Sequence, residues 1–230
     1  MADIVPNATG TLQNNITVVA SPQNDTSLTI AAGSDRYLLA VVVVRDTAMP
    51  GIAMTWNGVA VTLLNSQKQD TWDEWVYIFG LSAPDTGNQT AVLSWTGGGT
   101  FRYASRLLCL NNVSGVSGTL INNSGASADP TQNIATAPGD ATLTAWTHSG
   151  TTTAGSWPGA GYTSLMQDAG HGSIKYTLST SSNDAHQFAY DEASANWGVA
   201  GIRLLKTGGG GGGSPSPVIV GKQFRGLIYS

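Results

Sequence analysis

A run of ten residues, 36–45, constrains the fold of this chain more than any other stretch. An arginine stands at each end of the run, and the interior is almost entirely apolar, with four consecutive valines before the second arginine. β-Branched side chains lose rotamer freedom in a helix but pack well on a pleated sheet. Because the run is short and bounded by turn-forming residues, it predicts a strand that is apolar on both faces and lies in the middle of the fold.

The rest of the chain also favours β-structure. Asn57-Gly58 lies between two runs of β-forming residues and accommodates the positive φ angles of a type I′ hairpin turn. Short strands are expected at residues 15–19 and 27–31, with a polar loop at residues 21–25 between them. No stretch of ten residues has the apolar spacing of an amphipathic helix. Turn-forming clusters recur at intervals of roughly 8–12 residues, as in a β-sandwich, and the chain is therefore predicted to be all-β.

The second half of the chain repeats the strand pattern of the first at a distance of about 95–105 residues. In this comparison Leu143 takes the place of Leu38. Three further segments match in order, namely residues 161–166 with 59–64, 173–178 with 75–80, and 197–205 with 103–108. Two such groups suit the two Greek keys of a jelly roll. Two tandem small sandwiches fit less well, because residues 111–139 contain strand-like pieces and no clean linker. We therefore expect a jelly-roll-like antiparallel β-sandwich with two pseudo-repeated strand groups and an extended C-terminal arm.

Composition limits the partners of this protein. Charged residues form 10% of the chain, against about 25% in an ordinary soluble domain. The net charge is −4 and lysine and arginine do not cluster, so nucleic acid is not expected as a partner, because phosphates are bound by clustered cations. No apolar run is long enough to cross a membrane. The N-terminus lacks the basic and apolar regions of a signal peptide, which predicts folding in a cytoplasm.

The composition changes abruptly after residue 207. Six glycines form a flexible tether, Ser-Pro-Ser-Pro forms a stiffer one, and the last thirteen residues return to strand-forming chemistry. We expect an N-terminal arm or leading loop at residues 1–13, a β-sandwich body at 14–207, a linker at 208–217 and a docking peptide at 218–230. The residues proposed to anchor this assembly arm are Val218, Ile219, Val220, Phe224, Arg225, Leu227, Ile228 and Tyr229.

Candidate catalytic and metal-binding residues are few. The three histidines are scattered, without a cysteine pair or a His-Glu-x-x-His motif, and there is no Gly-x-Ser-x-Gly elbow. We therefore expect neither enzyme activity nor a cofactor. The single Cys109 is expected to be a small buried hydrophobic residue. Asp70, Asp73 and Glu74 crowd one loop, where they form either a Ca²⁺ site or a solvated polar turn.

The aromatic residues suggest glycan binding as an alternative function. Seven tryptophans outnumber the four phenylalanines. Trp72 and Trp157 fall in predicted loops beside polar residues, where an indole can stack on a sugar ring or plug the end of a sandwich. These two residues are the candidate glycan contacts, and anchoring of the loops is the alternative.

The order of the motifs RYLLAVVVV, TWNGVAVTLL, WVYIFGL and TAVLSW, followed by an Ala/Leu-rich strand, resembles a family of β-sandwich modules. These modules occur in bacteriophage structural proteins and in uncharacterised bacterial surface or secreted proteins. The resemblance covers residues 34–206 and implies a fold and a virion or surface setting. It transfers no catalytic residue to this chain.

The resemblance and the tail together predict a non-enzymatic structural protein of a phage-like virion, in capsid decoration or in a tail, fibre or spike. The expected partners are other virion proteins or copies of the same chain, in a homo-oligomer assembled in the host cytoplasm. The alternative is a glycan-binding module or adhesin that uses its loop tryptophans on a host surface glycan.

Overall fold

The computed structural model describes residues 3–11, 13–45, 51–69, 74–96, 100–117, 121–127, 131–148, 162–168, 172–178, 183–187 and 195–208. The regular secondary structure of these residues consists of seventeen β-strands, and they include no helix. The predicted all-β class is therefore confirmed. In this part of the chain there is accordingly no helix that could cross a membrane.

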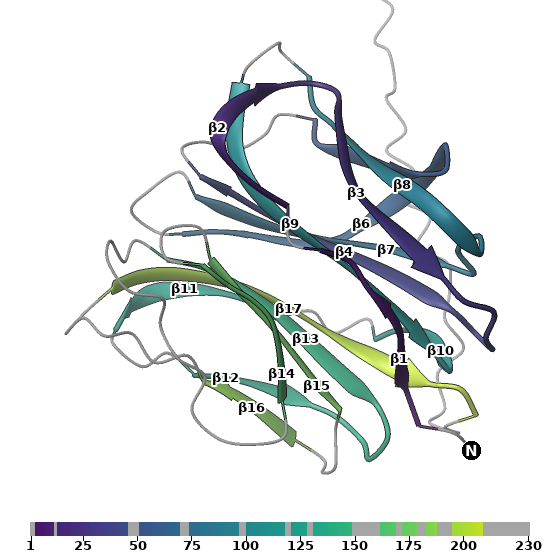
Figure 1. Ribbon diagram of the computed structural model, residues 1–230. Helices are drawn as coiled ribbons and strands as arrows, with labels where there is room; N and C mark the ends of the chain where they lie inside the picture. Colours follow the sequence, from purple (N-terminus) through teal and green to yellow (C-terminus); the bar gives the residue numbers. More distant parts are fainter. Residues whose placement is uncertain are drawn as a thin grey trace, which may run out of the picture.

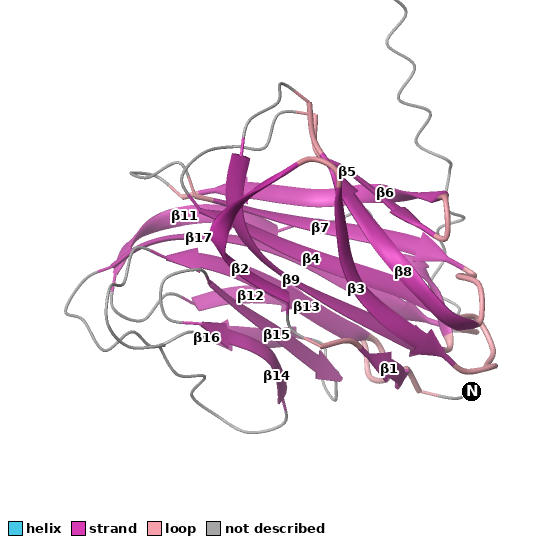
Figure 2. Ribbon diagram, turned by 45° about the horizontal axis from the view of Figure 1, so that its top comes forward, coloured by secondary structure: helices cyan, strands magenta, loops and turns pink. Residues whose placement is uncertain are grey.

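The first half of the chain forms a nine-stranded antiparallel sheet that curls into a nearly closed barrel (Figures 1 and 2). The strand order is β1-β9-β4-β7-β6-β5-β8-β3, and β2 pairs with β9 beside β1. The bounds are β1 (Val5–Thr9), β2 (Gln13–Ala20), β3 (Gln23–Ile30), β4 (Tyr37–Arg45), β5 (Ala53–Trp56), β6 (Val59–Lys68), β7 (Trp75–Ser82), β8 (Gly87–Ser94) and β9 (Thr100–Asn111).

The second half forms a six-stranded sheet in the order β10-β17-β13-β15-β14, with β11 also paired to β17, and a separate pair of strands, β12 and β16. The bounds are β10 (Val113–Val116), β11 (Ile121–Ser127), β12 (Thr131–Ala135), β13 (Ala141–His148), β14 (Tyr162–Asp168), β15 (Gly172–Leu178), β16 (Asn183–Gln187) and β17 (Ala195–Lys206).

Part of the strand order is the same in the two halves. The row β9-β4-β7-β6 recurs as β17-β13-β15-β14, and the pair β3-β8 recurs as β12-β16. Every described pairing joins two strands of the same half, whereas a jelly roll would mix strands of both halves in each sheet. The predicted jelly-roll topology is therefore corrected. Each half builds its own sheet, because strands that are close in sequence pair most readily, and the halves then pack face to face (Figure 1).

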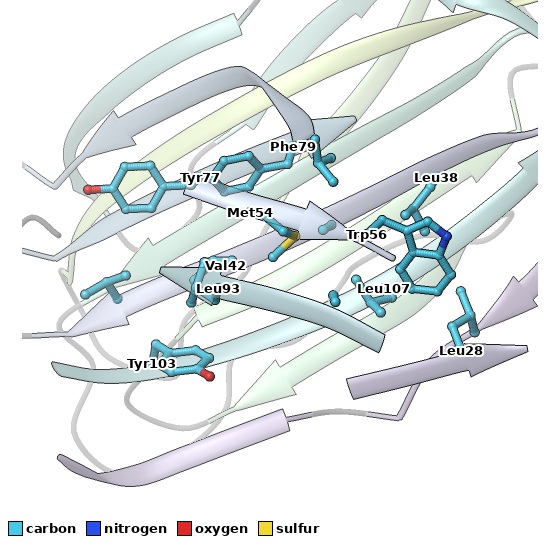
Figure 3. Packing of buried hydrophobic residues seen from close by; sticks show 14 of the residues in the cluster. Leu28, Leu38, Val42, Met54, Trp56, Tyr77, Phe79, Leu93, Tyr103 and Leu107 are labelled. Carbon is cyan, nitrogen blue, oxygen red and sulfur yellow. The ribbon is translucent and has the colours of Figure 1, made fainter. Parts of the chain in front are cut away.

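Strand β4 lies at the centre, as the apolar run predicted. It pairs with β7 on one side and with β9 on the other. Leu39, Val41 and Val43 point into a core that both halves build, which we call the inter-half core. Leu38 and Val42 point the other way, into the barrel core, where Figure 3 shows them with large side chains such as Trp56 and Met54. Burial of each such aliphatic side chain contributes roughly 1.5–3 kcal/mol.

Turn geometry also follows the sequence at the predicted hairpin. Asn57 and Gly58 connect β5 to β6 and have φ angles of 48° and 78°. Positive φ at both central residues is what a type I′ turn requires. The predicted hairpin tip is confirmed.

Two segments that the sequence assigned to irregular structure form strands instead. Within residues 1–13, expected to be an arm or leading loop, β1 pairs with β9, from Val5 opposite Asn111 to Thr9 opposite Leu108. Strand β3 begins at Gln23, inside the predicted loop at residues 21–25. Neither segment alternates cleanly between apolar and polar residues, so its strand conformation depends on the neighbouring strand edge.

Candidate functional site

The end of β17 lies in a polar junction from which the predicted arm departs. Five segments meet there: the N-terminal residues, the connection between β3 and β4, the link between the halves, the turn before β13, and the end of β17. We call this junction the arm root. It consists of Asp3, Asp35, Asn112, Asp140, Arg203, Lys206 and Thr207.

Asp140 is the buried acid of the arm root, with 4% of its surface exposed. Its Oδ2 lies 2.8 Å from Nε and 2.6 Å from Nη2 of Arg203. Its Oδ1 accepts a hydrogen bond of 3.0 Å from the backbone N–H of Lys206. Hydrogen bonds between charged partners are shorter and stronger than neutral ones. The carboxylate therefore attaches the last residues of β17 to the turn that precedes β13.

Asn112 links the two halves at the same place. Its φ of 63° is in the left-handed region, which asparagine tolerates better than most residues. Its N–H donates to the carbonyl oxygen of Ser34 at 2.9 Å. The N–H of Val113 donates to the carbonyl oxygen of Asp35 at 3.0 Å. Thr207 donates from its N–H to Asn112 O and from its hydroxyl to Asp35 Oδ2, both at 2.9 Å. The last residue before the glycines is thus bonded to the first half and to the link.

Most of the predicted site residues lie outside the described residues. This applies to all eight arm residues (Val218, Ile219, Val220, Phe224, Arg225, Leu227, Ile228 and Tyr229) and to the docking peptide as a whole. It also applies to both candidate glycan contacts, Trp72 and Trp157, and to Asp70 and Asp73 of the candidate calcium loop.

Glu74, at the end of the acidic loop, points into the protein. It is 7% exposed, and its Oε2 accepts a hydrogen bond of 3.0 Å from the hydroxyl of Thr147 in the other half. The N–H of Gln69 donates to the carbonyl oxygen of Glu74 at 3.0 Å, and the buried Gln69 side chain donates to Asn196 O. Glu74 therefore joins the two halves and is not part of a solvated turn. Among the described residues no group of three potential metal ligands is found.

A buried acid that the sequence did not single out lies in the barrel. Asn24 pairs with Val92 and Ser27 with Thr90, so that one extra residue forms a bulge in β3. The bulge turns two consecutive side chains, Asp25 and Thr26, away from solvent, with exposures of 8% and 6%. An aspartate in a polar segment gave no signal of burial, because strict alternation would have left one of these two residues outside.

Only one oxygen of the Asp25 carboxyl, Oδ1, accepts hydrogen bonds from the described residues. Its Oδ1 accepts from the Ser105 hydroxyl at 2.6 Å and from the Thr26 N–H at 2.8 Å. Its Oδ2 is buried and has no partner among the described residues. Burial raises the pKa of the Asp25 carboxyl, and the two hydrogen bonds to Oδ1 oppose that rise.

Cys109 behaves as the sequence predicted. It is completely buried in the barrel core. Burial raises the pKa of its thiol to about 11, against opposing effects of Arg36 and of backbone hydrogen bonds. A thiol that stays neutral at physiological pH is a poor nucleophile. Its role in the structure is that of a small apolar side chain.

Comparison of the chain with protein-family models, with curated proteins and with solved structures finds no match. The arm root is therefore interpreted from its own geometry. Its hydrogen bonds fix the end of β17 to both halves of the body. Asp25 is the other unusual feature, because its buried Oδ2 has no hydrogen-bond partner among the described residues.

Proposed function

We propose that this protein is a non-enzymatic structural protein of a phage-like virion, which assembles through its C-terminal segment. The place in the particle is capsid decoration or a tail, fibre or spike, and the partners are other virion proteins or further copies of the chain. The arm root carries the proposal. Because Thr207 is bonded to Asn112 and Asp35, the last residue before the glycine linker is held at a fixed point on the body.

The chemistry of the tail supports docking by addition of a strand. An extended peptide can bind the edge of a neighbouring sheet through main-chain hydrogen bonds, while alternate side chains enter pockets. If fully extended, residues 214–230 reach about 55 Å, enough to cross to a neighbouring subunit. Phe224, Leu227, Ile228 and Tyr229 would be the apolar anchors, and Arg225 the polar one.

Truncation after Thr207 tests this function. We expect the shortened chain to keep the melting temperature of the full chain, because both cores and the hydrogen bonds of the arm root are built from residues that the truncation retains. It should lose self-association, measured by light scattering on a sizing column, and recovery in sedimented particles. A full-length control with serine at Phe224, Leu227 and Ile228 should lose assembly to the same extent.

Three outcomes would contradict the proposal. If the truncated chain assembles normally, the tail is not the arm. If truncation unfolds the body, the tail is part of the body. If glycan-array binding is found and is lost in Trp72→Ala and Trp157→Ala, the protein is a glycan-binding module or adhesin instead.

A further inference from the structure

At one boundary of the barrel, side-chain hydrogen bonds link the two ends of the sheet, where no backbone pairing of strands is described. Strand β3 is at one end of the strand order and β1 is at the other, beside β9, and the described pairings do not join them. Asn7 of β1 bridges to the residue after β3. Its Nδ2 donates to Ala31 O at 3.1 Å, and its Oδ1 accepts from Ala31 N–H at 3.0 Å. We call the boundary between β3 and the β1–β9 edge the seam.

The second bridge across the seam is the hydrogen bond between Asp25 of β3 and Ser105 of β9, at 2.6 Å. Gly10 lies beside it, with its N–H bonded to Leu107 O at 2.9 Å. A Cβ placed on Gly10 would lie 3.5 Å from Thr26 Oγ1, so the β1–β2 connection packs against the same bulge. Asp25 is thus at the point where the two ends of the sheet meet.

No cation faces this carboxyl from the strands around it. Strands β1, β2 and β8 contain no ionisable residue in their sequences. On β9, the titratable residues of the barrel core are Tyr103 and Cys109, and neither side chain can carry a positive charge. Arg106 follows Ser105 directly and therefore points to the opposite face of the sheet. β4 turns only apolar residues to the barrel core.

The surroundings of the carboxyl consequently favour its protonated state over its ionised state. Ionised, it would place negative charge on Oδ2, which no described donor contacts. Protonated, it keeps both hydrogen bonds on Oδ1 and leaves only a neutral hydroxyl without a partner. An unpaired buried charge costs far more than an unpaired neutral polar group.

We propose that Asp25 is a pH-sensitive latch of the barrel, which holds the seam closed while its carboxyl is protonated and loosens it on ionisation. The direction of the effect follows from linkage. Burial raises the pKa of Asp25 above its ordinary value of 3.8. A group with a raised pKa stabilises the fold fully below the unfolded pKa and loses that contribution as the pH rises through the folded pKa. The latch is independent of the proposed role in assembly.

The test compares the full chain with Asp25→Asn, which keeps the shape and cannot ionise. Asp85→Asn is the matched control, because Asp85 is an exposed acid bonded to Asn57. Melting temperatures are measured from pH 4 to pH 9. We expect the melting temperature of Asp25→Asn to rise relative to that of the natural chain by roughly 3 °C per pH unit, until the carboxyl of the folded natural chain has ionised. The difference in melting temperature between Asp85→Asn and the natural chain should stay constant.

A local measurement locates the change in the seam. Hydrogen exchange of β3 amides, corrected for the intrinsic effect of pH, should accelerate relative to β4 in the natural chain and not in Asp25→Asn. A pH-independent or reversed difference in melting temperature overturns the latch, and so does unchanged protection of β3. If Asp25→Asn does not fold, the ¹³C resonance of the Asp25 carboxyl in the natural chain decides. A midpoint at or below 3.8 overturns the proposal, and a higher midpoint with loss of β3 protection supports it.

Discussion

Leu64 in β6 and Leu165 in β14 occupy the same position in the two halves, because each is the extra residue of a β-bulge. The register passes from Leu63 to Asn65 against β7, and from Ser164 to Met166 against β15. A bulge opposes two residues to one and bends the strand locally. Its recurrence at equivalent sites indicates that the β6–β7 and β14–β15 pairs share the same local geometry.

The bulges also establish which residues correspond. Reading across the sheet from β6 gives the row Thr62, Gly80, Leu39 and Leu108, and reading from β14 gives the row Thr163, Tyr176, Leu143 and Ile202. Leu143 therefore corresponds to Leu39 and not to Leu38, as the sequence comparison had it. The difference of one residue matters because it reverses the face. Leu39 and Leu143 both lie in the inter-half core, whereas Leu38 lies in the barrel core.

The first prediction concerns the close contact between β17 and the end of β6. A Cβ on Gly198 would lie 2.8 Å from the carbonyl oxygen of Lys68 and 3.0 Å from the backbone nitrogen of Gln69. Backbone atoms cannot move aside cheaply, so Gly198→Ala should lower the free energy of unfolding by about 1–3 kcal/mol. Urea denaturation measures the change. Gly115→Ala is the control, because nothing lies within 4 Å of its added Cβ, and equal losses in both variants would contradict the contact.

The second prediction tests the central strand. Val42 is completely buried in the barrel core. Val42→Asp would bury a charge without a partner, at a cost of several kcal/mol, and we expect no soluble folded protein. Val59→Asp introduces the same charge at a residue that is 48% exposed and should remain soluble. The soluble yield and the β-sheet signal in circular dichroism provide the measurement, and a folded Val42→Asp protein would refute the two-sided burial of β4.

The third prediction concerns the arm root. Asp140→Asn removes the charge that accepts hydrogen bonds from Arg203 and from the N–H of Lys206. Because the carboxylate is buried, the loss should be about 1–3 kcal/mol in the free energy of unfolding. Asp3→Asn, at an exposed site whose carboxylate is 4.0 Å from Lys206 Nζ, should cost at most about 1 kcal/mol. Equal stability of the two variants would contradict the prediction, because the buried contacts of Asp140 would then contribute no more to the free energy of unfolding than the exposed Asp3 does.

The fourth prediction concerns Cys109. Its pKa of about 11 and its complete burial predict that the thiol does not react with a disulfide reagent at pH 8 in the folded protein. Unfolding in guanidinium should release one reactive thiol per chain. Absorbance of the released thiolate follows the reaction. Rapid stoichiometric labelling before unfolding would mean that the barrel core opens readily.

Several features of the fold could be read directly from the residues. The valine run predicted a strand buried on both faces, because only a central strand can bury consecutive apolar side chains. Asn57-Gly58 predicted its turn, because few dipeptides accept two positive φ angles. These predictions depend on the chemistry of neighbouring residues, which the sequence contains in full. The repeated order of strands was visible for the same reason.

The pairing between distant strands was decided by tertiary structure. The one-residue difference between Leu38 and Leu39, as counterparts of Leu143, depends on the bulges at Leu64 and Leu165, which no local pattern marked. The choice between a jelly roll and two separate sheets depended on which edges meet. In the same way, Asp25 lies in a polar segment, and it is buried because the bulge in β3 and the approach of Ser105 from β9 place it at the seam. Local residues set the conformation of a strand, but only the folded chain determines what each strand faces.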